Sequence, residues 1–484
     1  MANRLMLVTS ALTVISAVVL SSASSPQEPK ALIGNATKAL NCENLRTIEF
    51  SGSGADFVLG QAPNPSSPWP RFIDKTYTRV INFELPSSRM QRIRTQGENP
   101  PRGGGLQPVV GERTETQVIA PGSPQASALR DDLMMSLPYG FLRSAALAND
   151  ATVKSQKVGG KNYTVLTFTA SNRAPASGYF NEQNMLERVE TKIDNPVLGD
   201  IPYETTFMDY KDFNGVKFPT HVVQKQGGYP VLDLTITDVK PNAPANIENP
   251  PANAGPAGSA GTQTATSEKL GDGMYLILGN YAAIVADFQD YIVVVEGGLN
   301  DQRSAAVITE AKRLVPNKPI KYVVNTHHHF DHSGGLRAYV AEGATVITQQ
   351  INKPYYENIW ANPHMLNPDR LARNPKKPTF KTVNEKLVLT DGTHVIELYH
   401  LQNFDHNDGM LIAYLPKEKV LVEADGFNPP VPPATQPPAT MSPYTASLAA
   451  NLERLKLDVE RIVPIHYPAD NRKVLFAELK MAVR

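Results

Sequence analysis

The residues best suited to binding metal ions in this sequence lie within six positions. His327, His329, Asp331 and His332 combine imidazole nitrogens with a carboxylate oxygen, a donor set that suits zinc first and also iron or manganese. A loop can turn alternate side chains toward one point. His327 and His329 could therefore share one ion, while Asp331 and His332 address a second. The alternative is a surface loop that binds metal adventitiously, but these residue types favour a dedicated site.

The segments on either side indicate what must position this cluster. Residues 321–324 are mostly apolar and predict a short buried strand. Residues 336–342 predict a helix that begins after Ser333 and two glycines. The candidate ligands therefore lie on a strand-to-helix loop, where α/β proteins commonly place their chemistry. His328 stands between two candidates and is expected to point away from the metal ions.

Residues 326–332 resemble the signature of the metallo-β-lactamase superfamily, which is His-x-His-x-Asp-His after a strand. That family needs three more ligands, and the chain offers a candidate for each next to a predicted strand. His406 precedes one apolar strand, Asp425 follows the next, and His466 closes a late one. The resemblance implies an α/β fold for the C-terminal part, namely the αββα sandwich of this superfamily.

The resemblance also implies how the ligands divide between two divalent ions, Zn²⁺ first, with Fe or Mn as alternatives. The first ion is implied on His327, His329 and His406, the second on Asp331, His332 and His466, with Asp425 bridging the two. Two ions about 4 Å apart can share a water and lower its pKa to about 7. The implied activity is hydrolysis by a metal-activated water, with Asp331 also catalytic through the nucleophile's orientation or its proton.

The substrate implied is a small molecule with an ester, amide, thioester or phosphoester-type bond. Two subgroups of the superfamily expect residues that this chain lacks. A glyoxalase-type thioesterase has a further His soon after the position of His406, where Asn407 stands here. Quorum-quenching lactonases usually place a Tyr just beyond the bridging Asp, and Gly426 and Phe427 follow Asp425. A β-lactam or another cyclic amide or ester remains allowed.

Two other functions are consistent with the same motif. One is a mononuclear iron oxidoreductase similar to persulfide dioxygenases, which hold one iron on two His and an Asp. Retention of all seven ligand positions favours two ions over one. The other is a non-catalytic periplasmic binding or relay protein on the same fold. Such proteins often lose ligands, and none is lost here.

The length of 484 residues indicates more than one domain. The chain has 47 basic and 47 acidic residues and no basic run, which argues against a nucleic-acid partner. Its single cysteine, Cys42, excludes an intrachain disulfide and a cysteine-based zinc site. We predict a signal peptide at 1–23, a β-rich N-terminal domain at 24–240, a linker rich in Pro, Ala and Gly at 241–266, and the catalytic domain at 267–484. The oligomeric state is left open.

The N-terminal segment predicts export. Arg4 supplies a positive charge, residues 5–20 are apolar, and small residues that end at Ala23 offer a cleavage site. The apolar run is short for a membrane span, although an uncleaved anchor is the alternative. We therefore expect a periplasmic or secreted protein, with no stable membrane span after cleavage.

The N-terminal domain is expected to be mainly antiparallel. Asn214-Gly215 separates two β-patterned runs, 205–213 and 216–223, and is a strong hairpin signal. Residues 231–239 predict a further strand. The hairpin resembles those of exported half-barrel domains of the lipoprotein-carrier type, so a half-barrel is one form that this domain could take. We expect it to brace the enzyme or to present substrate, and predict no site in it.

Two long insertions in the catalytic domain could shape the pocket. Residues 352–377 contain two Tyr and a Trp, and residues 428–443 are rich in proline and begin three residues after Asp425. A loop attached to a ligand strand usually lies near the mouth of a site. Either loop could form a lid or a wall, or both could be passive.

Overall fold

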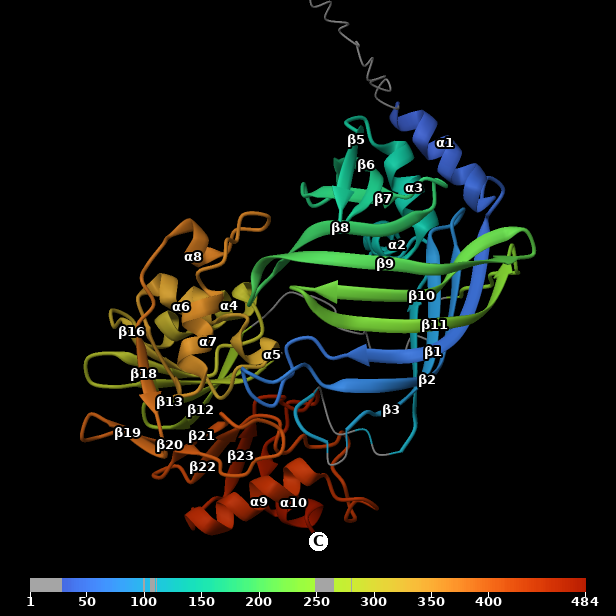
Figure 1. Cartoon of the computed structure of the whole chain (residues 1–484). Helices are drawn as coiled ribbons and strands as arrows, with labels where there is room; N and C mark the ends of the chain where they lie inside the picture. Colours follow the sequence, from blue (N-terminus) through green and yellow to red (C-terminus); the bar gives the residue numbers. More distant parts are fainter. Residues whose placement is uncertain (1–27, 99–100, 105–108, 110, 249–264, 280) are drawn as a thin grey trace, which may run out of the picture.

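The computed structural model describes residues 28–98, 101–104, 109, 111–248, 265–279 and 281–484. The predicted signal peptide and residues 249–264 of the predicted linker lie outside these ranges. The chain forms an N-terminal part built on one large sheet and a C-terminal part built on two smaller sheets (Figure 1). Within the described ranges, we find no helix with both the length and the apolar character needed to cross a membrane.

The N-terminal sheet has eleven strands, and all neighbouring strands are antiparallel. In chain order they are β1 (Thr47–Phe57), β2 (Arg71–Asn82), β3 (Ser87–Gln96), β4 (Arg113–Ile119), β5 (Thr152–Val158), β6 (Lys161–Thr169), β7 (Pro175–Phe180), β8 (Leu186–Asn195), β9 (Gly199–Phe213), β10 (Val216–Gln226) and β11 (Tyr229–Pro241). The spatial order is β4-β3-β2-β1-β11-β10-β9-β8-β7-β6-β5. The predicted antiparallel character of this region is confirmed.

The β9–β10 hairpin shows how the sequence sets this topology. Asn214 and Gly215 have φ of 50° and 89°, so both occupy the left-handed conformation that a two-residue type I′ turn requires. The turn places Val216 opposite Phe213. The hairpin predicted from the Asn-Gly pair is confirmed.

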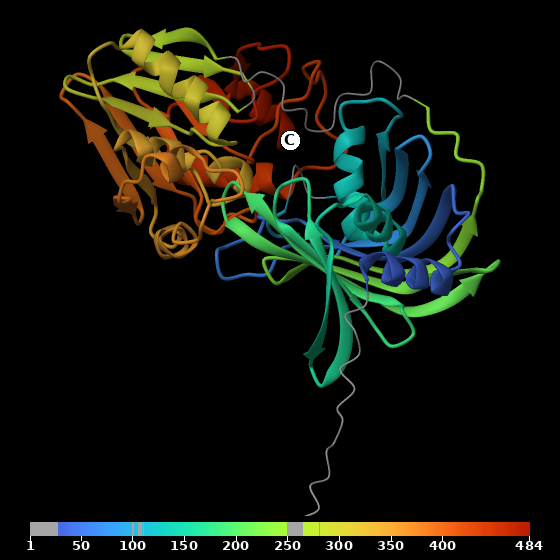
Figure 2. The same cartoon turned by 90° about the horizontal axis from the view of Figure 1, so that it is seen from above.

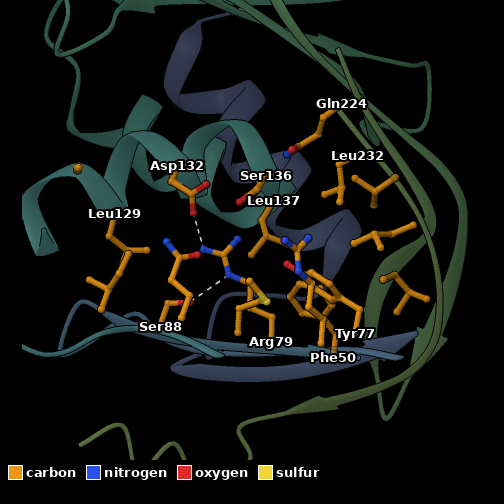
Figure 3. A pocket seen from close by; sticks show the side chains of 18 of the residues that line it. Phe50, Tyr77, Arg79, Ser88, Leu129, Asp132, Ser136, Leu137, Gln224 and Leu232 are labelled. Atoms are coloured by element: carbon orange, nitrogen blue, oxygen red, sulfur yellow. Dashed lines mark hydrogen bonds and ion pairs between the residues drawn. The ribbon is translucent and has the colours of Figure 1, made fainter. Parts of the chain in front are cut away.

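Three helices pack on the inner face of this curved sheet (Figure 2). They are α1 (Pro29–Leu40), α2 (Ala126–Ser136) and α3 (Pro138–Leu147). Between α2 and the sheet lies a cavity of about 450 Å³ with mostly apolar walls (Figure 3). The Arg79 guanidinium in this cavity is paired with Asp132 and donates to Ser88 Oγ at 3.0 Å. The charge of Arg79 is thus already balanced within the domain.

The C-terminal part is a sandwich of two sheets. The first contains β12 (Thr266–Gly271), β13 (Met274–Leu278), β14 (Ala283–Asp287), β15 (Ile292–Val295), β16 (Ile320–Val324), β17 (Thr345–Gln349) and β18 (Phe380–Val383). The second contains β19 (Lys386–Thr390), β20 (Val395–His400), β21 (Leu411–Leu415), β22 (Val420–Glu423), β23 (Arg461–Pro464) and β24 (Val474–Leu475). The neighbours β15–β18 are parallel, as are β22 and β23.

Helices cover both outer faces of the sandwich. The first sheet carries α4 (Asp301–Leu314), α5 (Phe330–Ser333), α6 (Leu336–Glu342), α7 (Asn352–Ile359) and α8 (Arg370–Arg373), and the second carries α9 (Pro443–Leu455) and α10 (Phe476–Ala482). Strand β15 shows why two layers form. Ile292 and Val294 pack toward the helices, whereas Val293 and Val295 pack toward the other sheet, because successive side chains of a strand point to opposite faces. The predicted αββα fold is confirmed.

Candidate metal centre

All seven predicted ligands meet at one edge of the sandwich. His327 and His329 follow β16, and Asp331 and His332 lie in the short helix α5. The other three come from the second sheet, where His406 precedes β21, Asp425 follows β22 and His466 follows β23. Their potential ligand atoms form two groups, and within each group these atoms lie within 4.8 Å of one another. The groups are His327, His329, His406 and Asp425, and then Asp331, His332 and His466.

The carboxylate of Asp425 lies between the two groups. Its Oδ2 is 3.3 Å from His327 Nε2 and 3.4 Å from His406 Nε2. The same oxygen is 3.0 Å from His332 Nε2, and Oδ1 is 2.8 Å from His466 Nε2. Asp425 therefore reaches members of both groups, as a bridging ligand must.

Several nitrogens at the centre of the cluster lack a hydrogen-bond partner. His327 Nε2, His329 Nδ1 and His406 Nε2 are buried and form no hydrogen bond. A buried polar atom without a hydrogen-bond partner lowers the stability of the fold by about 1–3 kcal/mol. Three such nitrogens near one carboxylate therefore indicate a missing partner that accepts lone pairs. Divalent ions such as zinc, iron or manganese bind imidazole and carboxylate groups, so these residues fit the predicted metal ions.

Burial sets the protonation of two histidines of the first group. It lowers the pKa values of His327 and His329 well below the usual range, and neighbouring histidines lower them further. These imidazoles are therefore neutral at physiological pH and keep a lone pair for a ligand bond. Burial alone would raise the pKa of Asp425, but the charges of His332, His466 and His406 outweigh it and hold this pKa well below its usual range.

A buried acid and a threonine support the first histidine of the motif. The Thr326 hydroxyl donates to Glu296 Oε2 at 2.5 Å and lies 3.1 Å from His327 Nδ1. Glu296 is fully buried and also lies 3.6 Å from His332 Nδ1. Contacts of this kind orient metal-binding imidazoles and raise their basicity. They leave Nε2 of His327 directed at Asp425.

The amide of Asn325 fixes the loop that carries the motif. Its Nδ2 donates to the carbonyl oxygens of His327 and His332 at 2.6 and 3.1 Å. Its Oδ1 accepts from Tyr356 at 2.7 Å and from Thr348 at 3.1 Å. With donors and acceptor all used, this buried side chain can hold one loop conformation.

A second buried acid holds the loop that carries Asp425. Glu423 Oε2 accepts from the backbone N–H groups of Gly426 and Phe427 at 3.0 and 3.2 Å. Burial raises the pKa of Glu423 to about 8, despite these two hydrogen bonds, and the nearby charge of Asp425 adds to the rise. Asp425 has a φ of 59°, a left-handed conformation that aspartate tolerates better than most residues.

The open side of the cluster is formed by Asp331 and His466. Their side chains are 23% and 17% exposed, whereas those of His327, His332 and His406 are almost fully buried. Tyr281 stands at this side and donates to Asp331 Oδ2 at 3.0 Å. The cluster is therefore open to solvent along Asp331 and His466. Tyr281 was not predicted, because it lies between β13 and β14, far from the motif in the chain.

The N-terminal domain also reaches the cluster. The loop between β1 and β2, residues 58–70, extends to α5 (Figure 1). Gln61 Nε2 donates to Asp331 Oδ1 at 2.8 Å, and the carbonyl oxygen of Ala62 lies 2.8 Å from His329 Nε2. Sequence reasoning assigned no site to this domain and missed both contacts.

The two insertions lie differently around the cluster. Tyr355 of α7 sets its ring 5.5 Å from the ring of His328, so the first insertion backs the motif loop. In the second insertion, residues 430–440 are exposed to solvent, whereas the ring of Tyr444, the residue that follows it, lies 4.9 Å from the ring of His406. Whether either loop closes over a substrate stays a prediction.

His328 lies outside both groups, as its place in the motif predicted. Its Nδ1 is 3.1 Å from Asn407 Nδ2, and burial lowers its pKa to about 3. We expect His328→Ala to leave the number of bound metal ions unchanged, because the ring faces Asn407 and Tyr355 instead of Asp425. Elemental analysis of the purified variant measures this, with His329→Ala as the control that loses metal. Loss of one ion from His328→Ala would contradict the placement.

Residues 277–466 match the family model described as "Metallo-beta-lactamase superfamily". No protein with a curated description matches the chain. Among solved structures, a metallo-β-lactamase from Pontibacter korlensis is 16% identical, with 46% of this chain and 97% of that one covered and a TM-score of 0.35. The mono-zinc form of the metallo-β-lactamase FIM-1 from Pseudomonas aeruginosa is also 16% identical, with 46% of this chain and 93% of that one covered and a TM-score of 0.33. Rubredoxin oxygen:oxidoreductase from Desulfovibrio gigas is 15% identical, with 45% of this chain and 61% of that one covered and a TM-score of 0.34.

Proposed function

We propose that this protein is a metal-dependent hydrolase with two divalent ions, zinc first, because residues 277–466 match the metallo-β-lactamase superfamily model. Its substrate is a small molecule with an ester, amide, thioester or phosphoester-type bond. The observation that carries the proposal is the convergence of all seven candidate ligands into two adjoining groups. Retention of both groups favours two ions, and two ions favour hydrolysis over the chemistry of a single iron.

The residues divide the work as follows. When bound, two such ions lower the pKa of a shared water to about 7 and polarise a carbonyl or phosphoryl oxygen. His327, His329 and His406 hold the first position, and His332, His466 and Asp331 hold the second. Asp425 faces both positions and keeps them adjacent. Asp331 Oδ2 lies at the open side, 3.7 Å from His466 Nε2, where it can orient the nucleophile or accept its proton.

We place this activity in the periplasm or outside the cell. The basis is the sequence of residues 1–23, with a basic residue, an apolar run and small residues near Ala23. Equal numbers of acidic and basic residues support a small-molecule substrate over a nucleic acid. Detection of the mature protein in a periplasmic or culture fraction, with an N-terminus after residue 23, tests the location.

The function is tested by metal quantification together with a panel of chromogenic substrates. We expect two zinc ions per chain and hydrolysis of one class among ester, thioester, phosphodiester and lactam substrates. One iron per chain without zinc would favour the oxidoreductase alternative. Metal-loaded protein that hydrolyses nothing in the panel would favour a binding or relay role on the same fold.

A further inference from the structure

The loop that joins β1 to β2 crosses from the N-terminal domain onto the metal centre. Its residues, 58–70, are not part of a helix or strand, and they contact the catalytic domain at successive positions. The carbonyl oxygen of Gly60 lies 3.3 Å from the backbone nitrogen of Phe330, and that of Pro63 accepts from Asp408 N–H at 2.8 Å. Gln61 and Ala62 lie between these two contacts and face the cluster itself.

The Ala62 carbonyl determines which nitrogen of His329 can bind metal. A carbonyl oxygen can only accept a hydrogen bond, so His329 Nε2, 2.8 Å away, carries the proton. The Asn407 amide nitrogen, 3.2 Å from the same Nε2, has acceptors of its own in His328 Nδ1 at 3.1 Å and the Ala62 carbonyl at 3.4 Å. In a neutral imidazole the other nitrogen then holds the lone pair. That nitrogen, Nδ1, is the buried atom without a hydrogen-bond partner, and His329 belongs to the first ligand group.

Gln61 acts in a similar way on the second group. The Asp331 carboxylate can only accept, so the Gln61 amide must present its Nε2 to Oδ1, 2.8 Å away. This contact leaves Oδ2 turned toward His332 Nε2 at 3.4 Å and His466 Nε2 at 3.7 Å. Gln61 therefore holds the carboxylate in the orientation in which one oxygen faces the other two members of its group.

The rest of the interface holds this loop in place. Asn64 Nδ2 donates to Asp408 Oδ2 at 2.8 Å. Gly104 N–H donates to the Gln61 carbonyl at 2.7 Å, and Tyr444 donates to the Gly103 carbonyl at 2.6 Å. Gly60 has a φ of 74°, and a Cβ there would come within 2.2 Å of the Phe330 ring. Only glycine allows so close an approach without displacing the loop.

We propose that the N-terminal domain completes the metal centre, with Gln61 as a positioning residue for Asp331 and the Ala62 carbonyl as the group that sets the tautomer of His329. This inference rests on the proposed binuclear function and extends it. A centre of this kind is built from both domains, and its affinity for metal depends on their docking. Loss of a partner that orients a metal ligand in this way typically weakens metal affinity about 10–100-fold.

The test is zinc affinity in the full-length chain, measured by competition with a chromophoric chelator. We expect Gln61→Ala to weaken the second zinc about 10–100-fold and to leave the first unchanged. Asn64→Ala is the matched control, because it removes an amide hydrogen bond from the same loop at Asp408, outside both ligand groups. The backbone contacts of Gly60, Gln61 and Pro63 remain in this variant and keep the loop in place. It should bind both ions as the wild type does.

A further variant tests the loop as a whole. Gly60→Ala should weaken both ions, because displacement of the loop removes the partners of His329 and Asp331 together. Thermal unfolding of the metal-free variants separates this effect from a loss of fold. Unchanged affinities in Gln61→Ala, or equal losses in Gln61→Ala and Asn64→Ala, would overturn this inference alone. A wild-type chain that binds no divalent ion would instead overturn the proposed function.

Discussion

Replacement of Asp425 with alanine should remove most of the bound metal and lower hydrolysis by more than about 100-fold. Loss of a group that merely orients a ligand typically lowers metal affinity or activity about 10–100-fold. A larger effect is expected here because Asp425 is itself a candidate ligand of both ions. Its two oxygens lie 2.8–3.4 Å from ring nitrogens of four histidines. Elemental analysis and the rate on the best substrate of the panel measure the two effects.

A neighbouring acid offers the control for this substitution. Asp405 precedes His406 in the chain, yet its carboxylate belongs to neither ligand group. Asp405→Ala should therefore retain two ions per chain. If Asp425→Ala also retained two ions with wild-type affinity, Asp425 could not be the shared ligand, and the assignment of both groups would have to change.

The seven candidate ligands could be predicted from the sequence because His and Asp are recognised by residue type alone. His and Asp are metal-binding residue types, and each predicted ligand adjoins a short apolar run. Those runs became β16, β21, β22 and β23. A strand end is a local feature, and parallel strands bring their carboxyl ends to one edge of the fold. Local patterns therefore sufficed to collect seven residues spread over 140 positions, from His327 to His466.

The contribution of the N-terminal domain could not be predicted in this way. The Ala62 carbonyl is a backbone group, so residue type gives no signal for it, and Gln61 lies 270 positions before Asp331. One cue was present. Residues 58–70 form a connection of 13 residues between antiparallel strands, and connections this long without secondary structure are often functional.

The helices of the N-terminal domain left a clearer signal. Leu129 and Leu133 are spaced as on one face of a helix, and both are buried in α2. Pro138 then occupies the first turn of α3, where proline is well tolerated. The β-patterned runs dominate this region, so the sequence analysis describes it as a β domain. The helices that fill its inner face were therefore not predicted, although the spacing of Leu129 and Leu133 was present.

Replacement of Asp331 with alanine should separate the two ions. The first group, His327, His329, His406 and Asp425, remains complete, so we expect one ion to stay bound. The second group keeps only His332 and His466 besides the shared Asp425, and its ion should be lost or greatly weakened. Hydrolysis should fall to background, because the open side then lacks the carboxylate that orients the nucleophile or holds its proton. Metal titration and rates on the best panel substrate measure both effects.

Asp331→Asn sharpens this prediction because it keeps the volume of the side chain and removes its charge. The pKa of Asp331 is held well below its usual range, since the charges of His332 and His466 and a hydrogen bond from His332 outweigh the effect of burial. The carboxylate is therefore ionised throughout the neutral range, and the neutral amide should weaken the second ion as alanine does. A normal rate in either variant would show that Asp331 is not needed for catalysis. Activity would then have to come from the first ion alone, as in a mononuclear enzyme.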